Sequence, residues 1–82
     1  MNIFVGNIHA RTTARHLSNL FFEFGRVISS KIAVDSDTGH SLGFGFIVME
    51  NRTGATAVSQ LNNMHFMNTY LEVSETRPQR LF

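Results

Sequence analysis

Three phenylalanine side chains, Phe4, Phe44 and Phe46, occupy positions from which they could bind flat ligands by stacking. Phe4 stands between two aliphatic residues, and Phe44 and Phe46 alternate with glycines, so both segments have the alternating pattern of β-strands. Successive side chains of a strand point to opposite faces, which puts the three rings on the face away from the aliphatic residues. A nucleobase stacked on such a ring contributes about 1–3 kcal/mol. The pattern therefore predicts a stacking surface for nucleobases.

The side chains that usually perform catalysis or bind metals have no useful spacing in this chain. The four histidines are scattered, and the absence of cysteine excludes disulfides, thiolate metal sites and cysteine nucleophiles. Asp35, Asp37 and Gly39 are similar to the start of a calcium-binding loop, but the glycine comes one position early and Phe46 stands where the bidentate glutamate belongs. No Ser-His-Asp set or paired carboxylate cleft is found. We expect no enzymatic activity, no metal site and no cofactor.

The composition is that of one small globular domain in a reducing compartment. The chain has 82 residues, of which 43% are hydrophobic, and a net charge of +1. This charge is too small for binding that depends on many phosphate contacts, so binding of a nucleic acid must rely on stacking and hydrogen bonds. No signal peptide or membrane-spanning run is visible, and we expect a cytoplasmic protein. Met1 directly before a strand favours a complete minimal protein, with an excised domain as the alternative.

Hydrophobic periodicity and turn residues predict four strands and two helices. The strands are expected at residues 2–6, 27–34, 42–49 and 70–74. One helix is expected from an N-cap at Thr13 to about residue 24, and the other from an N-cap at Asn51 to about residue 62. This β-α-β-β-α-β order is typical of an α+β, ferredoxin-like sandwich, with a four-stranded antiparallel sheet and both helices on one face. We expect a domain at residues 1–76 and a polar C-terminal tail at residues 77–82.

Alternation along the strands assigns each residue to one of the two sheet faces. The apolar faces of the helices are expected to consist of Leu17, Leu20, Phe21 and Phe24 in the first and Ala55, Val58 and Leu61 in the second. The sheet face under the helices is expected to hold Ile3, Val5, Ile32, Val34, Ile47, Met49, Leu71 and Val73. The open face is expected to hold Phe4, Lys31, Leu42, Phe44, Phe46, Val48, Tyr70 and Glu72. Three rings on a face without a covering layer indicate a ligand or partner.

Two segments resemble the sequence motifs of RNA recognition motif domains. Residues 3–8 (IFVGNI) are similar to the hexamer motif of that family, and residues 42–49 (LGFGFIVM) are similar to its octamer motif. The resemblance covers nearly the whole chain and extends to small single-domain RNA-binding proteins of bacteria. It implies that residues 1–76 form an RNA recognition motif domain that binds single-stranded RNA. It also implies that Phe4 and Phe46 each stack on a base and that Phe44 packs against sugars between them.

The resemblance implies further candidate RNA-binding residues around the rings. Asn7 matches a family position that fixes a loop or contacts a base. Lys31 is a candidate phosphate contact, with a solvated charge as the alternative, and Leu42 is a candidate contact, with a filler of the sheet surface as the alternative. The last strand and the stretch after it contribute Ser74, Glu75, Thr76 and Arg77. Leu42 replaces the usual basic residue of the octamer motif, so we expect weak-to-moderate affinity with modest salt dependence.

A second class of function stays open at this point. Leu42, Phe44 and Phe46 could instead form a surface for protein–protein interaction or self-association, although we expect a monomer. A small enzyme on the same fold is the third class, and the residue inventory argues against it. The RNA sequence preference and the discrimination between RNA and single-stranded DNA do not follow from the sequence, because groups that would read the 2′-hydroxyl cannot be identified.

Overall fold

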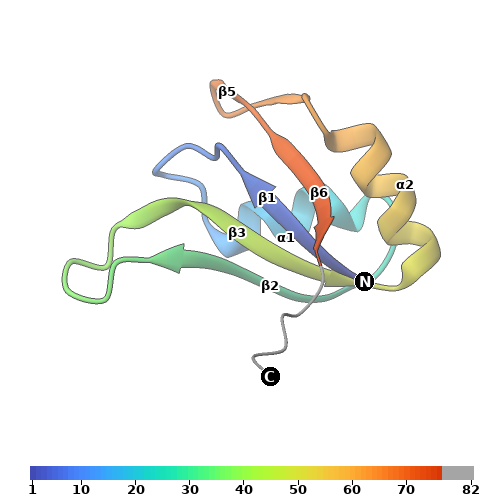
Figure 1. Ribbon diagram of the computed structural model, residues 1–82, viewed down its shortest axis with the longest axis horizontal. Helices are drawn as coiled ribbons and strands as arrows, with labels where there is room; N and C mark the ends of the chain where they lie inside the picture. Colours follow the sequence, from blue (N-terminus) through green and yellow to red (C-terminus); the bar gives the residue numbers. More distant parts are fainter. Residues whose placement is uncertain (77–82) are drawn as a thin grey trace.

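The computed structural model describes residues 1–76 and has the predicted ferredoxin-like architecture (Figure 1). Its elements are β1 (Asn2–Gly6), α1 (Ala14–Phe22), β2 (Val27–Val34), β3 (Ser41–Met49), α2 (Asn51–Leu61), β4 (His65–Phe66), β5 (Thr69–Tyr70) and β6 (Glu72–Thr76). Four strands form an antiparallel sheet in the order β2-β3-β1-β6, and β4 pairs with β5 in a separate two-stranded ribbon. The proposed tail at residues 77–82 lies outside the described residues.

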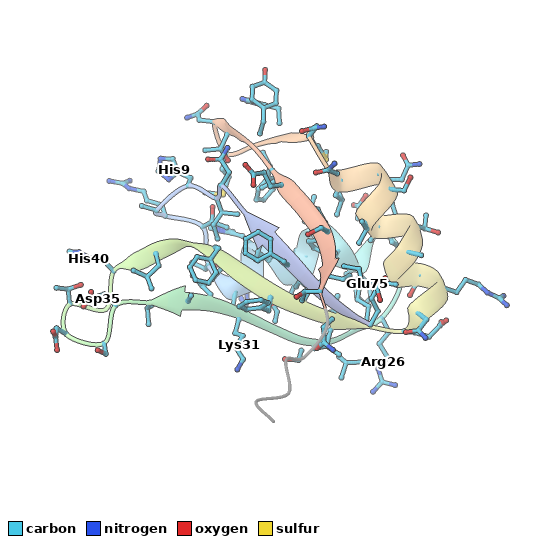
Figure 2. The ribbon with its side chains drawn as sticks, viewed as in Figure 1. His9, Arg26, Lys31, Asp35, His40 and Glu75 are labelled. Atoms are coloured by element: carbon cyan, nitrogen blue, oxygen red, sulfur yellow. The ribbon has the colours of Figure 1, made fainter. Side chains whose placement is uncertain are left out.

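The far end of the β2–β3 hairpin projects beyond the helix layer, with Asp35 and His40 near its tip (Figure 2). Val34 was expected under the helices, but this prediction was wrong because 51% of the residue is exposed. Ile32 pairs with Gly45, whereas Val34 pairs with Ser41, so β3 contains extra residues at this point. Gly43, with a φ of 86°, lies in this bulge, and its conformation is one that glycine adopts without a steric penalty.

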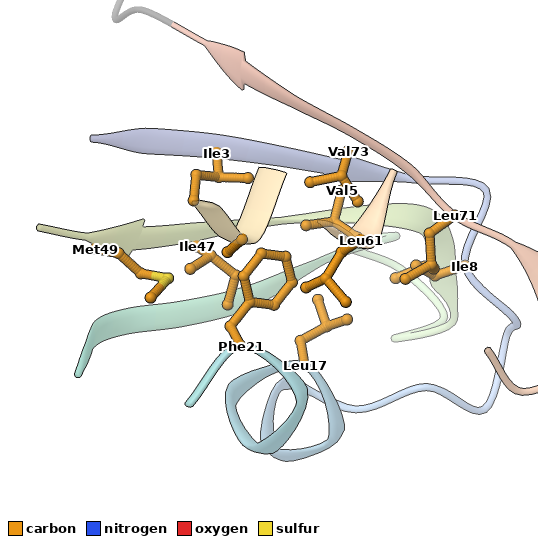
Figure 3. Packing of buried hydrophobic residues seen from close by; sticks show 11 residues of the cluster. Ile3, Val5, Ile8, Leu17, Phe21, Ile47, Met49, Leu61, Leu71 and Val73 are labelled. Atoms are coloured by element: carbon orange, nitrogen blue, oxygen red, sulfur yellow. The ribbon is translucent and has the colours of Figure 1, made fainter. Parts of the chain in front are cut away.

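One core lies between the sheet and the two helices (Figure 3). The sheet contributes the buried residues Ile3, Val5, Ile47, Met49 and Val73, the residue directly before β6 contributes Leu71, and the helices contribute Leu17, Phe21, Ala57 and Leu61. The alternation that predicted the inward residues of β1, β3 and the last strand is therefore confirmed. Burying each large side chain of this kind is worth about 1.5–3 kcal/mol, which holds the helices on one face.

Helix α1 begins where the sequence predicted and ends earlier. The Thr13 hydroxyl accepts a hydrogen bond from the backbone N–H of His16, and His16 Nδ1 accepts one from the N–H of Thr13, which completes a capping box. The helix was expected to reach about residue 24, but its last residue is Phe22. The N–H groups of Phe24 and Gly25 donate to carbonyls three residues back, so the final turn tightens and the α-helical pattern stops.

Helix α2 differs from its prediction in its cap and in its buried face. The N-cap is Glu50 and not Asn51, because the Glu50 carboxylate accepts a hydrogen bond from the N–H of Arg52 at 2.9 Å. Ala55 was expected in the core but is exposed, and the buried face consists of Gly54, Ala57 and Leu61. A Cβ on Gly54 would lie 2.9 Å from the sulfur of Met1, so this glycine lets α2 approach the start of β1.

The last strand of the sheet lies later in the chain than predicted. It was expected at residues 70–74, but β6 spans Glu72–Thr76. Tyr70 belongs to the β4–β5 ribbon, where its ring lies 5.0 Å from the ring of His65, so its predicted place on the open sheet face was wrong. The ribbon turns at Met67 and Asn68, which have φ angles of 49° and 66°, a pattern typical of a two-residue hairpin turn. The chain enters the sheet only after the buried Leu71.

Candidate functional site

The open face of the sheet carries rows of side chains that run across the strands. In the central row, Ser74 lies opposite Phe4, Phe4 lies opposite Phe46, and Phe46 lies opposite Lys31. Directly paired residues of antiparallel strands project to the same face, so this row crosses all four strands. The two flanking rows consist of Glu72, Gly6 and Phe44 on one side and Thr76, Asn2, Val48 and Ser29 on the other. Figure 1 views the sheet from this side, with α1 behind it.

The three rings form one cluster on this face. The centroid of the Phe4 ring lies 5.9 Å from those of Phe44 and Phe46, and the latter two centroids are 6.0 Å apart. The Phe46 ring meets the other two edge to face, at 66° and 88°, and the Phe4 and Phe44 rings are tilted by 30°. These are favourable aromatic geometries, so the rings hold one another in defined orientations while remaining only half-buried. The cluster can therefore receive flat ligands with little reorganisation.

Gly6 provides the space in which the Phe4 ring lies. A Cβ on Gly6 would be 2.6 Å from Cε2 and 2.8 Å from Cζ of Phe4, which is closer than such atoms approach. The Phe4 ring therefore covers the backbone of β1 at Gly6, the residue that pairs with Phe44. Sequence reasoning did not identify Gly6 as a site residue, because a glycine at the end of a strand also reads as an ordinary turn residue.

The two glycines of β3 have different roles under the rings. A Cβ on Gly45 would lie 2.5 Å from the carbonyl oxygen of Lys31 and 3.1 Å from Cδ1 of Ile32, so Gly45 allows close contact with β2. Gly43 instead supplies the left-handed backbone of the bulge described above.

Asn7 and Leu42 lie where β1 and β3 meet the loops. Asn7 has a φ of 56°, and its Nδ2 donates a hydrogen bond of 2.8 Å to the carbonyl of Tyr70. This bond ties the loop after β1 to the β4–β5 ribbon. The N–H of Ile8 donates to the carbonyl of Gly43, which holds the same loop against β3. Leu42, beside Gly43, is 54% exposed, so its side chain adds apolar surface at this end of the sheet.

The predicted residues of the last strand divide between the two faces. Ser74 and Thr76 pair with Phe4 and Asn2, and so they lie on the side of the rings. Glu75 pairs with Ile3, whose side chain is in the core, and therefore projects to the helix side at the sheet edge, where Figure 2 labels it. The structure does not bring the Glu75 side chain to the aromatic cluster. Arg77 lies outside the described residues.

Charges are sparse on the open face. Among the described residues of the three rows, Lys31 is the one cation. It lies at the β2 edge of the sheet in Figure 2. Glu72, on β6, carries the opposite charge. At the hairpin tip, the Asp35 carboxylate accepts hydrogen bonds from the N–H groups of Thr38 and Asp37, and these bonds hold the pKa of Asp35 below its ordinary value of 3.8. The acidic tip is thus a hydrogen-bonded turn.

Residues 1–76 contain neither a metal-binding cluster nor a membrane-spanning helix. This part of the chain contains no group of three or more His, Cys, Asp or Glu side chains that could hold a metal ion. None of the helices in the same range is long and apolar enough to cross a membrane.

Known proteins resemble this chain in sequence and in fold. The family model for the RNA recognition motif matches residues 3–72. The protein RbpE of Nostoc sp. is 35% identical over 80 residues, which cover 96% of this chain and 81% of that protein. The crystal structure of RNA-binding protein PG1 superposes with a TM-score of 0.90 at 36% identity and covers 96% of this chain and 99% of that one. A Sex-lethal protein–RNA complex also gives a TM-score of 0.90, at 30% identity, and covers 98% of this chain and 48% of that one.

Proposed function

The chain belongs to the RNA recognition motif family, and from this premise we propose that it binds short single-stranded RNA across the open face of its sheet. In this proposal, Phe4 and Phe46 each stack on one base, and Phe44 packs against the sugars between them. The solved complex of a similar chain with RNA supports the ligand class. A surface with two or three stacking positions contacts about two to four nucleotides.

The observation that carries the proposal is the aromatic cluster on a face without a helix. Three half-buried rings lie within 6.0 Å of one another, flanked by Ser74 and Lys31 in the central row. Each stacked base would contribute about 1–3 kcal/mol, so two bases suffice for weak-to-moderate affinity without a strongly basic surface. Lys31 is the proposed phosphate contact, and the hydroxyls of Ser74 and Thr76 are proposed hydrogen-bonding groups beside the rings.

The proposal is tested by titrating isotope-labelled protein with a pool of short single-stranded RNA and following the amide and aromatic resonances. We expect shifts at Phe4, Phe44, Phe46 and the neighbouring β6 residues. The double variant Phe4→Ala/Phe46→Ala should lose at least about tenfold in affinity, because it removes two stacking positions. Phe22→Ala is the matched control, since Phe22 lies on α1 with 67% of its surface exposed and belongs to none of the rows.

Three outcomes separate the possible uses of this face. Shifts lost in the double variant and kept in Phe22→Ala would support stacking. Unchanged resonances at roughly millimolar RNA, beyond even weak non-specific affinity, would contradict RNA binding. A mass in solution that grows with protein concentration, without RNA, would instead favour self-association through Leu42, Phe44 and Phe46. We propose a monomer, because rings occupied by a second copy would be unavailable to a base.

The biological role and the range of ligands extend the same proposal. A small, sequence-tolerant stacking surface suits post-transcriptional regulation or RNA chaperoning in the cytoplasm, and the absence of cysteine fits that reducing compartment. Stacking uses the base and not the sugar, so single-stranded DNA of the same sequence is expected to bind as well. Parallel titrations with RNA and DNA measure how much any 2′-hydroxyl contact adds.

A further inference from the structure

An open hollow lies beside the sheet, between the loop that follows β1 and the turn of the β4–β5 ribbon. Its volume is about 590 Å³, and it is lined by His9 and Arg11 from the loop and by Met67 and Asn68 from the turn. Figure 2 shows His9 in this loop, at the end of the molecule where the ribbon lies. None of the four lining residues is acidic, and none of them belongs to the three rows of the open face.

The lining groups combine hydrogen-bond donors with a soft apolar surface. The N–H of Arg11 donates to Nδ1 of His9 at 3.0 Å, so the neutral imidazole carries its proton on Nε2 and offers it as a donor. Arg11 is exposed and provides a guanidinium that can donate two parallel hydrogen bonds to a phosphate. The amide of Asn68 can donate and accept, and the thioether of Met67 is a polarizable contact for an aromatic ring.

The two walls of the hollow are fastened together. The buried Thr12 hydroxyl donates to the sulfur of Met67 at 3.6 Å, and Asn7 Nδ2 donates to the carbonyl of Tyr70 at 2.8 Å. Met67 keeps a φ of 49°, which is uncommon for a residue other than glycine, asparagine or aspartate. These contacts fix the distance between loop and ribbon, so the hollow is formed before a ligand arrives.

The hollow lies within reach of a strand that crosses the aromatic cluster. His9 follows Gly6 by three residues, which span at most about 11 Å of chain. Gly6 lies in the row of Phe44, and the bond from Ile8 to Gly43 keeps the loop beside that row. At about 3.4 Å per stacked nucleotide, the hollow is therefore at most about three nucleotides from the row of Gly6 and Phe44.

We infer that this hollow binds one further nucleotide of the RNA strand, with its phosphate on Arg11 and its base against Met67 and His9. This inference rests on the proposed function, since the strand is delivered to the hollow by the stacking surface. The hollow thereby lengthens the binding site beyond the two or three bases that the rings can hold. It also provides a cationic contact away from Lys31, at the end of the site where the octamer motif has Leu42 in place of a basic residue.

The test compares random-sequence RNA pools of about three and about seven nucleotides, the first matched to the rings alone. We expect wild type to bind the longer pool about tenfold or more tightly, the size of one charge-assisted contact. A longer RNA can also bind in more registers, which raises its apparent affinity without any further contact. The loss of affinity for the longer pool in Arg11→Gln therefore measures the contact in the hollow. The matched control is Arg15→Gln, an exposed arginine on α1 that does not line the hollow. The methyl resonance of Met67 should shift only with the longer pool.

The two pools distinguish failure of this inference from failure of RNA binding. Binding of the short pool, and its loss in Phe4→Ala/Phe46→Ala, tests the stacking surface alone. If the short pool binds normally while Arg11→Gln and Arg15→Gln have equal affinity for the long pool, the hollow is not a nucleotide site. An unshifted Met67 methyl at saturation leads to the same conclusion. If neither pool binds, both proposals are overturned.

Discussion

Gly6 leaves the space in which the Phe4 ring lies, so the addition of one methyl group at Gly6 should weaken RNA binding. In Gly6→Ala, the added Cβ would clash with Cε2 and Cζ of Phe4 at 2.6 and 2.8 Å, and the ring must turn away. We expect the affinity for short single-stranded RNA to fall about 5- to 150-fold, the worth of one stacked base. Titration calorimetry measures this loss, and the Phe4 ring resonances report the displacement directly.

Ser59→Ala is the matched control for Gly6→Ala, because Ser59 is exposed on α2 and belongs to none of the rows of the open face. Its affinity should stay within about twofold of wild type, since surface substitutions away from a site change free energies by less than about 0.5 kcal/mol. Equal losses in both variants, or a Gly6→Ala protein of normal affinity with displaced ring resonances, would contradict the role given to the Phe4 ring.

A second prediction at the residue scale concerns Asp35 in the β2–β3 tip. Its carboxylate accepts hydrogen bonds from the N–H groups of Thr38 and Asp37, which favour the charged form and lower its pKa. Because the folded pKa is depressed, the stabilisation of the turn is present above the unfolded pKa and is lost as pH falls through the folded value. The amide resonances of Asp37 and Thr38 should therefore titrate with a midpoint below 3.8. Asp35→Asn should abolish this transition, and a midpoint at or above 3.8 would disprove the assignment.

At the scale of elements, β2 depends on a position in β3 that has no side chain. A Cβ on Gly45 would lie 2.5 Å from the carbonyl oxygen of Lys31, and a strand backbone yields less readily than the end of a side chain. Gly45→Ala should therefore displace β2 and lower the free energy of unfolding by about 1–3 kcal/mol, as overpacking does. Urea denaturation measures this change. Ser29→Ala, a β2 substitution on the open face, should change it by less than about 0.5 kcal/mol. A fully stable Gly45→Ala protein would contradict the close contact between the strands.

The sequence predicted those elements whose signals are local and missed those that depend on register. Alternation identified the inward residues of β1 and β3, and Thr13 identified the start of α1, because each signal is read within a few residues. Val34 and Tyr70 were misplaced for another reason. The bulge in β3 and the β4–β5 ribbon shift the pairing of residues far apart in the chain, and alternation assumes an unbroken strand.

The candidate site also has a part that the sequence predicted and a part that it missed. The three rings were predicted by motif and alternation together, and the structure brings them into one cluster. The hollow lined by Arg11 and Met67 could not be predicted, because it lies between a loop and a turn whose hydrogen bonds join residues more than fifty positions apart in the chain. Loop contacts of this kind have no periodic signal in the sequence.

At the scale of the whole molecule, the distribution of charge decides how binding responds to salt. Residues 1–76 contain five arginine and lysine side chains against six acidic ones, and the remaining two arginines, Arg77 and Arg80, follow the last strand. Within the described rows, Lys31 is the cation next to the rings. Each phosphate contact with single-stranded nucleic acid contributes about −0.7 to the slope of log affinity against log salt. One to four contacts, from Lys31, Arg11 and the two following arginines, therefore predict a slope of about −0.7 to −2.8.

The tail arginines are the charges that this slope should detect. Arg77→Gln/Arg80→Gln removes the two cations nearest in sequence to β6, the strand that carries Ser74 beside Phe4. If they contact phosphates, the variant should bind RNA less tightly at low salt and show a slope shallower by about 0.7 to 1.4. Arg52→Gln, an exposed arginine on α2, changes the net charge without touching the open face and should leave the slope nearly unchanged. A wild-type slope steeper than about −3 would instead require phosphate contacts from the helix layer, which would move the path of the strand away from the three rings.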